Sequence, residues 1–343
     1  MMSKHPKKRR KKKLIQNILI LCLSLVFLVA GAGCIYADHM LGRINFIGDE
    51  STKTNTAPIF QTNGSLNAKT GLLGGLYHDD AITNILVMGV DDYQPNDPGR
   101  SDSMILASID TRHQKLKLTS FMRDMYVAIP GKDSNRLNVA YSSGGPQLAV
   151  KTIEANFGVD IDRFVLIDYS SFSQIVDKLG GVDMTITQGE ANLINRYSGD
   201  SKRNLKEGTF LLTGKQALYY SRIRAIGNDF ERTERQRKVF SSLINKFKTA
   251  NIGTINQALY DVLPLVGTNM TKNEILDMAA NSLTYLNYPI SQSRIPGDDA
   301  YVSDKVSIGG VGASVLIPNL DKCRDSVATF IYEDDIPTGE YND

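Results

Sequence analysis

The sequence predicts an α/β fold in which helices cover both faces of a central mixed sheet, preceded by one N-terminal transmembrane helix. Three observations lead to this class. Apolar runs of strand length alternate with amphipathic runs of helical length from residue 82 to about residue 332. The chain of 343 residues, 42% hydrophobic and 22% charged, is long enough to bury a substantial core. Residues 14–36 carry no charged side chain.

The first 37 residues predict a membrane anchor. Residues 1–13 hold eight basic and no acidic residues, and residues 14–37 would form a helix roughly 35 Å long at about 1.5 Å per residue. The basic flank predicts that 1–13 is a cytoplasmic tail and that the rest of the chain lies outside the cell membrane. The alternatives are a cleaved signal peptide and a lipoprotein signal acylated at Cys34. The length of the apolar run, and Gly31 three residues before Cys34, favour an uncleaved, single-pass anchor.

The net negative charge of the residues beyond the tail argues against a nucleic-acid-binding domain. Of the 39 basic residues, eight lie in the tail, and the remaining 31 stand against 37 acidic residues, which gives a net charge of −6. Cys323 is the one cysteine beyond the predicted anchor, so no disulfide within the extracytoplasmic part and no multi-cysteine metal site is expected.

Beyond the anchor we expect a stalk and one domain. Residues 38–80 are rich in Ser, Thr, Asn and Gly and show no sustained periodicity, which predicts a flexible stalk. Residues 81–335 form the predicted domain, and 336–343 a C-terminal tail. Strands are predicted from Ile82 to the aspartates at 91–92, at 104–110, 115–121, 164–169 and 182–187, and within 306–318. Helices are predicted at 146–158, 171–181, 212–224 and 229–248.

Four arginines stand within the sixteen residues 221–236, SRIRAIGNDFERTERQ. The last helix is expected to begin there, with Asp229 as its N-cap and an apolar stripe through Val239 and Leu243. Arg232 and Gln236 fall on that stripe, whereas Arg237 points elsewhere. An inward guanidinium needs an anion, and clustered arginines suit a pyrophosphate. A solvated, salt-bridged helix start is the alternative.

Aspartates and arginines also stand at the predicted strand ends. They are Asp91 and Asp92 after the first strand, Arg100 and Asp102 before the second, and Arg123 and Asp124 after the third. Strand ends at one edge of an α/β sheet commonly form a ligand crevice, and carboxylates beside arginines suit Mg²⁺ bound to a polyphosphate. Turn formation and capping are the alternative explanation for each residue taken singly.

Two other kinds of site are not predicted. The four histidines, at 5, 39, 78 and 113, form no nucleophile–base or zinc spacing. The segment 208–216, GTFLLTGKQ, resembles a phosphate-binding P-loop, but its glycines are one residue too far apart and Gln216 replaces the expected Ser or Thr.

Seven blocks, in order, make residues 82–335 resemble the LytR–CpsA–Psr (LCP) family. They are NILVMGVDD, GRSDSMILASID, SFMRDMYVAIPG, RLNVAYSSGG, FGVDIDRFVLIDYSSFSQIVDKLGGVDM, LTGKQALYYSRIR and DFERTERQRKV. The resemblance implies a three-layer α/β/α sandwich in a Gram-positive-type cell envelope. It also implies a phosphotransferase that moves a teichoic acid or capsular polysaccharide from a polyprenyl-pyrophosphate carrier to peptidoglycan.

The resemblance also implies roles for single residues. Asp91 and Asp102 match carboxylates that hold Mg²⁺, or Mn²⁺ in its place. The pyrophosphate-binding set is implied to be Arg100, Arg123, Arg222, Arg224, Arg232 and Gln236, with Arg235 as ligand or support. Among the catalytic residues, Arg123 and Arg232 grip the phosphates, while Asp124 and Asp229 orient arginines or assist the acceptor hydroxyl.

Two departures from the family pattern concern the wall of the pocket rather than its charged centre. They are Arg136 and Val139 in RLNVAY, and Phe121 and Met122 in SFMRD. Three other functions stay open for such a chain: a pyrophosphatase that uses water as acceptor, a scaffold that binds the lipid carrier without turnover, and a LytR-type transcriptional attenuator. The acidic charge beyond the tail argues against the last, so no nucleic-acid partner is expected.

Overall fold

The structure is a computed structural model, and it describes residues 38–47, 70–73, 75–91, 99–201, 204–249, 253, 257 and 260–338. The predicted tail (1–13) and anchor (14–37) lie outside the described residues. Within the described ranges no helix is both long and apolar enough to cross a membrane. The chain divides into two compact units, 1–44 and 45–343, and in the described part of the first, residues 38–41 form a helical turn.

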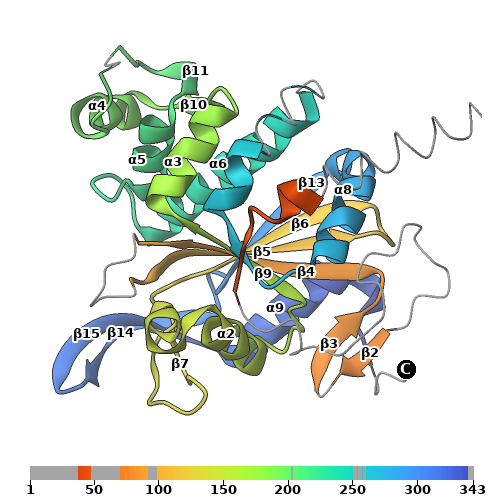
Figure 1. Cartoon of the computed structure of the whole chain (residues 1–343). Helices are drawn as coiled ribbons and strands as arrows, with labels where there is room; N and C mark the ends of the chain where they lie inside the picture. Colours follow the sequence, from red (N-terminus) through yellow and green to blue (C-terminus); the bar gives the residue numbers. More distant parts are fainter. Residues whose placement is uncertain are drawn as a thin grey trace, which may run out of the picture. The chain divides into compact units, whose positions relative to one another are not determined.

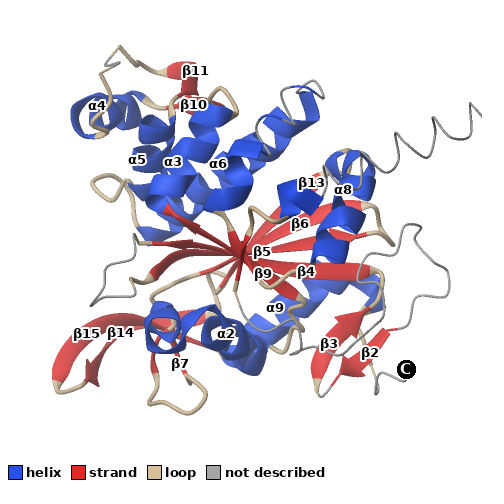
Figure 2. Cartoon of the chain, in the orientation of Figure 1, coloured by secondary structure: helices blue, strands red, loops and turns tan. Residues whose placement is uncertain are grey.

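The larger unit is built around a seven-stranded sheet with the order β1-β12-β9-β4-β5-β6-β13. Its strands are β1 (Asn45–Phe46), β4 (Ile82–Val90), β5 (Ser101–Asp110), β6 (Lys115–Phe121), β9 (Arg163–Asp168), β12 (Gly267–Thr268) and β13 (Ile290–Ile295). β4 pairs parallel with β9 and antiparallel with β5, and β6 pairs antiparallel with β5 and parallel with β13. The sheet is therefore mixed, as predicted, and Figure 1 and Figure 2 show helices on either side of it.

Helices bury both faces of the sheet, because neighbouring side chains along each strand point to opposite faces. Leu86 and Leu106 pack with α2 and α9, whereas Ile85 and Ile105 pack with α6 and α8. These helices are α2 (Asn138–Phe157), α6 (Asp229–Thr249), α8 (Lys272–Leu286) and α9 (Leu320–Tyr332). The predicted α/β architecture, a mixed central sheet with flanking helices, is confirmed.

A second core lies among helices and a two-stranded sheet, outside the central sheet. The elements are α3 (Tyr169–Lys178), β10 (Val182–Ile186), α4 (Gln188–Tyr197), β11 (Gly208–Leu212) and α5 (Gly214–Arg222). Val176, Leu212 and Val239 meet in this core. Gly181 has φ +93°, and a Cβ there would lie 2.8 Å from the Leu212 carbonyl oxygen, so the turn from α3 into β10 requires glycine.

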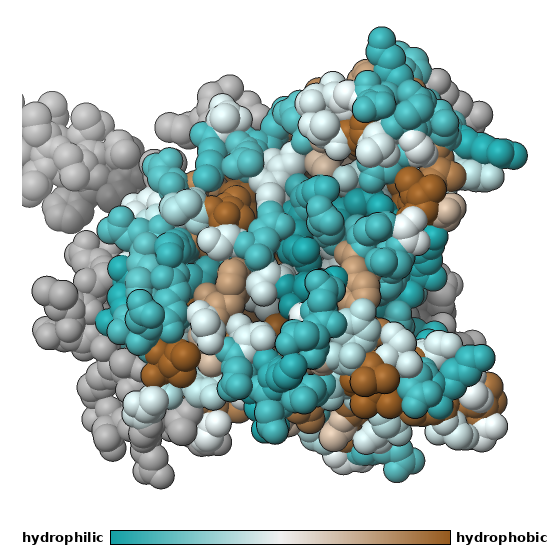
Figure 3. Space-filling model, turned by 180° about the vertical axis from the view of Figure 1, so that it is seen from behind, coloured by the Kyte–Doolittle hydropathy of each residue, from teal (hydrophilic) through white to brown (hydrophobic). Residues whose placement is uncertain are grey.

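Short hairpins complete the fold of this unit. They are β2 (Thr70–Leu73) with β3 (Leu76–Asp79), β7 (Tyr126–Val127) with β8 (Asn135–Arg136), and β14 (Tyr301–Ile308) with β15 (Val311–Pro318). The single-turn helices are η1 (Leu263–Leu265) and η2 (Glu333–Asp335). Figure 3 shows one face of the molecule, on which hydrophilic residues predominate and hydrophobic residues form separate small patches.

Most predicted elements are present, with shifted ends. β6 has the predicted bounds, and α6 extends the prediction by one residue. α2 begins at Asn138 rather than 146, because a helical segment precedes the break at Gly144 and Gly145. The strand predicted at 182–187 exists as β10, but it pairs with β11 instead of joining the central sheet.

Two predictions about the segments and helix ends are wrong. The segment 38–80 is not a stalk throughout, because β1 pairs with β12 at the edge of the central sheet and β2 pairs with β3. The N-cap of α6 is not Asp229. The side chain of Asn228 accepts hydrogen bonds from the backbone N–H groups of Phe230 and Glu231, at 2.9 Å and 3.2 Å.

Candidate functional site

The predicted site residues meet at one edge of the sheet. β4 and β6 both run antiparallel to β5, so their last residues lie beside the first residues of β5. Asp91 directly follows β4, Asp102 is the second residue of β5, and Arg123 is two residues beyond β6. Asp92 lies outside the described residues.

These residues surround a cavity of about 330 Å³, here called the arginine cavity. It is lined by Asp91, Arg100, Asp102, Arg123, Asp124, Arg136, Asn138, Arg222 and Arg224. Five arginines against three aspartates leave an excess of positive charge, which suits a small polyanion such as a pyrophosphate.

Arg123 is the centre of the charge network. Its Nη1 donates to Asp102 Oδ1 at 2.5 Å, its Nε lies 3.4 Å from Asp124 Oδ2, and its Nη2 lies 3.8 Å from Asp229 Oδ1. Burial acts to lower the pKa of Arg123, but the carboxylates of Asp124 and Asp102 raise it above its usual value. Arg123 is thus a fixed cation oriented by three carboxylates.

Arg232 is the most deeply buried of the predicted phosphate ligands, at 2% exposed. Its Nη2 pairs with Asp229 at 2.8 Å, while its Nε and Nη1 have no hydrogen-bond partner among the described residues. Burial lowers the pKa of Arg232, and the nearby guanidinium groups of Arg123 and Arg224 act in the same direction. Buried N–H groups without an acceptor are costly, so this side chain favours an anion beside it, although Arg232 does not itself line the arginine cavity.

Tyr169, which the sequence analysis missed, supports Asp102. Its hydroxyl donates to Asp102 Oδ2 at 2.7 Å, and its ring lies 4.1 Å from the guanidinium carbon of Arg222. Burial acts to raise the pKa of Asp102, but Arg123 and the Tyr169 hydroxyl hold it below its usual value. The only signal in the sequence was a tyrosine at the end of the strand predicted at 164–169.

Asp124 and Asp229 both flank Arg123 but differ in their surroundings. Asp124 lines the arginine cavity and lies 4.0 Å from Arg136. Asp229 pairs with Arg232, and burial is the main cause that raises the pKa of Asp229 above its usual value. Asp124 therefore faces the position of a ligand, while Asp229 connects two arginines.

The remaining predicted ligands approach from three segments. Arg222 ends α5, and Arg224, 58% exposed, lies 3.7 Å from Asp102 Oδ2. Gln236 of α6 donates to the Asp102 carbonyl oxygen at 3.5 Å. Arg100 is exposed at the rim of the cavity, where its carbonyl oxygen accepts a 3.2 Å hydrogen bond from the Asp91 N–H.

The structure does not bring Arg235 into this cluster. Its Nη2 donates to the Ile223 carbonyl oxygen at 2.7 Å, and its Nη1 lies 3.6 Å from Glu190. The residue thus ties α6 to the α5–α6 connection, which corresponds to support rather than to a ligand. Arg237 was expected to point away from the stripe of α6, but it is buried too, at 8% exposed, with its Nε 3.3 Å from Gln292.

The two departures from the family pattern have different places. Arg136 lines the arginine cavity, together with Asn138 from the start of α2. Phe121 and Met122 are buried in the core between the sheet and α2, at 2% and 0% exposed. The expectation that these two residues form the wall of the pocket is therefore wrong.

A second, apolar cavity of about 110 Å³ adjoins the site. It lies between the sheet and helices α3, α5 and α6, and Asp102 and Arg222 line both it and the arginine cavity, whereas Gln236 lines the apolar cavity alone. Its apolar lining consists mainly of Val87, Met88, Ile105, Ile167, Phe172, Ile175, Leu218, Val239, Phe240 and Leu243. We call it the apolar cavity, and its position beside clustered arginines suits an amphiphilic ligand with a charged head.

Asp91 and Asp102 have the chemistry of a magnesium site. Both carboxylates line the arginine cavity, and hard oxygen ligands together with phosphate oxygens are what Mg²⁺ prefers. The Asp102 carboxylate already accepts from Arg123 and Tyr169, whereas the Asp91 carboxylate accepts no hydrogen bond from any described residue. The pair therefore fits a cation that is shared with a bound pyrophosphate.

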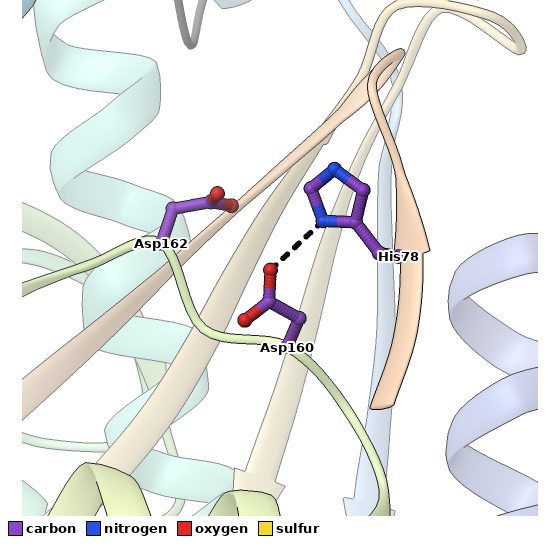
Figure 4. A group of neighbouring side chains, drawn as sticks. All are labelled: His78, Asp160 and Asp162. Atoms are coloured by element: carbon purple, nitrogen blue, oxygen red, sulfur yellow. Dashed lines mark hydrogen bonds and ion pairs between the residues drawn. The ribbon is translucent and has the colours of Figure 1, made fainter. Parts of the chain in front are cut away.

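Another cluster, His78, Asp160 and Asp162, also brings potential metal ligands together (Figure 4). The His78 Nδ1 lies 2.8 Å from Asp160, and its Nε2 lies 3.2 Å from Asp80. Burial acts to lower the pKa of His78, but hydrogen bonding to Asp160 and the neighbouring carboxylates raise it to about 9. With a carboxylate within hydrogen-bond distance of each ring nitrogen, the cluster forms an ion-pair clamp between β3 and the segment before β9.

Asp110, His113 and Glu333 form a third group of this kind. Here the Lys117 ammonium, 1% exposed, already lies 2.6 Å from Asp110 and 2.9 Å from Glu333. The carboxylates are thus neutralised by a buried lysine that ties β6 to the end of α9.

Known proteins match both the sequence and the fold. Residues 47–317 match the LytR_cpsA_psr family. The chain is 34% identical over 228 residues to the polyisoprenyl-teichoic acid–peptidoglycan teichoic acid transferase TagU of Oceanobacillus iheyensis, covering 64% of this chain and 67% of that protein. It is similar in structure to TagT bound to LIIa-WTA, with a TM-score of 0.61, 24% identity and coverage of 84% and 97% of the two chains. For TagV of Bacillus subtilis the TM-score is 0.56, the identity 26%, and the coverage 73% and 97%.

Proposed function

Since the chain belongs to the LytR_cpsA_psr family, we propose that it transfers an anionic glycopolymer from a polyprenyl-pyrophosphate carrier to peptidoglycan. The related TagU protein bears the name of a teichoic acid transferase that acts on peptidoglycan. A teichoic acid is accordingly the first polymer to test.

One observation carries this proposal: the arginine cavity and the apolar cavity share Asp102 and Arg222. A ligand that fills both needs a dense negative charge joined to a hydrocarbon chain. A polyprenyl pyrophosphate has this composition, whereas a free sugar phosphate has no hydrocarbon chain for the apolar cavity.

The chemistry follows from the positions of the charged groups. The acceptor hydroxyl of peptidoglycan attacks the phosphorus that bears the sugar, and the bond from this phosphorus to the bridging oxygen of polyprenyl phosphate breaks. Arg123 and Arg232 offset the charge that develops on the leaving phosphate. Asp124, which lines the arginine cavity, accepts the hydroxyl proton, and Asp229 orients the two arginines.

We further propose that Asp91 and Asp102 hold Mg²⁺, or Mn²⁺ in its place. The bound cation would supply neutralisation of the pyrophosphate charge. Removal of divalent cations with a chelator should therefore weaken binding of a pyrophosphate probe, measured by calorimetry. The same treatment should leave binding unchanged in the double variant D91N/D102N.

The location of the protein is also part of the proposal. We propose that residues 14–37 form a single membrane-spanning helix, with 1–13 in the cytoplasm and a three-layer α/β/α catalytic domain outside. The charge-free run behind eight basic residues supports this orientation. Externally added protease should digest the catalytic domain of intact protoplasts but spare a tag at residue 1.

The transferase proposal is tested with the full chain in detergent, a lipid-linked polymer and peptidoglycan. The variants R123A and R232A should each lower the transfer rate at least about 100-fold, which corresponds to about 2.7 kcal/mol or more of transition-state stabilisation. K238A is the matched control, because Lys238 lies on the same helix but is exposed and pairs with Glu234. Near wild-type transfer by both arginine variants would exclude the arginine cavity as the reaction site, and no transfer by the wild-type chain would exclude the transferase proposal. Release of free polymer, without attachment to peptidoglycan, would instead identify a pyrophosphatase.

A further inference from the structure

A third and larger cavity, of about 950 Å³, opens beside the arginine cavity. We call it the outer groove, and it lies along α3 and α5 next to the end of α4. Arg222 and Arg224 line both the outer groove and the arginine cavity. A chain attached to a phosphate in the arginine cavity therefore has a continuous path into the outer groove.

Helix α3 separates two environments of different chemistry. Phe172 and Ile175 line the apolar cavity, whereas Ser173, Gln174 and Asp177 line the outer groove. This division follows from the helical period, which turns residues three and four apart to the same side. Hydroxyl, amide and carboxylate groups do not suit a hydrocarbon chain, but they match the hydroxyl groups of sugars.

The outer groove also contains an aromatic pair. The rings of Tyr197 and Tyr219 are stacked, with centroids 6.1 Å apart and an interplanar angle of 28°. Both residues line the groove, and Tyr197 is 52% exposed although it is a large aromatic residue. Aromatic rings offer an apolar surface to the C–H groups of a sugar ring, while polar neighbours bind its hydroxyl groups.

We propose that the outer groove is a saccharide subsite, in which sugar units pack against Tyr197 and Tyr219 and hydrogen-bond to Gln174 and Ser173. This inference rests on the proposed transferase function, because it extends the path of the polymer beyond the pyrophosphate. The sugars come either from the donor, next to its pyrophosphate, or from a glycan strand of the acceptor. The shared chemistry is a neutral pyranose unit with a C–H face and several hydroxyl groups.

The absence of tryptophan from the sequence makes a direct binding assay available. In the full chain in detergent, Y197W keeps an aromatic ring in place and supplies a single fluorescent reporter. The first probe is a disaccharide pyrophosphate with a short prenyl chain, and the second is a peptide-free oligosaccharide from peptidoglycan. We expect at least one of them to change the emission with saturation, and we expect Y219A in this background to weaken its binding about tenfold.

Transfer kinetics supply a second readout. Y197A should raise KM about tenfold for the substrate whose sugars occupy the groove, with little change in kcat, whereas Y197F should keep both values because the ring remains. Y260A is the matched control, because Tyr260 is also exposed, at 37%, and does not line the groove. A KM effect on the donor identifies its sugars as the occupant, and an effect on the acceptor identifies the glycan strand.

The two proposals can fail separately. If neither probe changes the Y197W emission and Y197A and Y219A keep wild-type KM values, the saccharide subsite is refuted, even where transfer depends on Arg123. If a probe binds through the tyrosines but the wild-type chain attaches no polymer to peptidoglycan, the transferase assignment fails and the saccharide subsite stands.

Discussion

The hydroxyl of Tyr169 donates a 2.7 Å hydrogen bond to the Asp102 carboxylate, and its ring lies 4.1 Å from the guanidinium carbon of Arg222. One side chain thus positions a carboxylate and a cation of the same cavity. The two functions can be separated, because removal of the hydroxyl leaves the ring in place.

The variant Y169F should lower the transfer rate about tenfold at neutral pH, through loss of a charge-assisted hydrogen bond. It should also raise the pKa of Asp102, since that hydrogen bond favours the ionised carboxylate against the effect of burial. The acidic limb of the pH–rate profile should therefore move to higher pH. Y288F, a change in the core next to α8, should leave the profile unmoved; an unshifted profile in Y169F itself would contradict the role given to Tyr169.

Arg235 should matter for folding rather than for catalysis. Truncation to alanine leaves the Ile223 carbonyl and the buried Glu190 without this donor, so R235A should lower the free energy of unfolding by about 3 kcal/mol. Urea denaturation measures this loss. The control K238A removes only an exposed pair and should cost less than about 1 kcal/mol. Folded R235A that fails to bind a pyrophosphate probe would restore Arg235 as a ligand.

His78 should make stability depend on pH. Its pKa rises from 6.5 in the unfolded chain to about 9 in the fold, so its contribution is complete below pH 6.5 and is lost as pH rises through 9. We expect His78 to contribute about 1–2 kcal/mol to the free energy of unfolding below pH 6.5. This is less than the full pKa shift implies, because the clamp is partly solvated. Urea denaturation between pH 6 and pH 9.5 should show this decline in the wild type and in H113Q, but not in H78Q. An equal decline in H78Q would assign the pH dependence to another group.

A larger side chain in the apolar cavity should select against long lipids. Ser103 lines this cavity and is only half-buried, so S103F should fill it without disturbing the arginines. KM for a long-chain donor should rise at least about tenfold, while a donor with a short prenyl chain should keep its KM. S103A, which adds no volume, serves as the control. An equal change in KM for both donors would place the lipid elsewhere.

The sequence predicted those elements whose signals are local. β6 was found to the residue because its alternation of lysine and leucine, KLKL, follows a short turn at residues 111–113, and α6 because its amphipathic stripe continues over many turns. β1 could not be found in this way. It has two residues and exists only through its pairing with β12, more than 200 positions later in the chain.

The candidate site shows the same limit. Because Asp102 and Arg123 both stand at predicted strand ends, the sequence predicted that they share one ligand crevice, and the structure places them in contact. Arg235 is an arginine like Arg232 and lies only three residues later in the same helix. Only the course of the α5–α6 connection decides that one guanidinium is held by carbonyl oxygens and the other lacks acceptors for two of its nitrogens.

Arg222 lines the arginine cavity, the apolar cavity and the outer groove alike. In the proposed reaction, the bond that breaks lies at this junction, so the two products of one turnover face different exits. If the donor's sugars occupy the outer groove, the lipid phosphate leaves along the apolar cavity and the attached polymer leaves along α3 and α5. Neither product then has to pass the other, so the lipid carrier can leave while the grafted polymer is still in the groove.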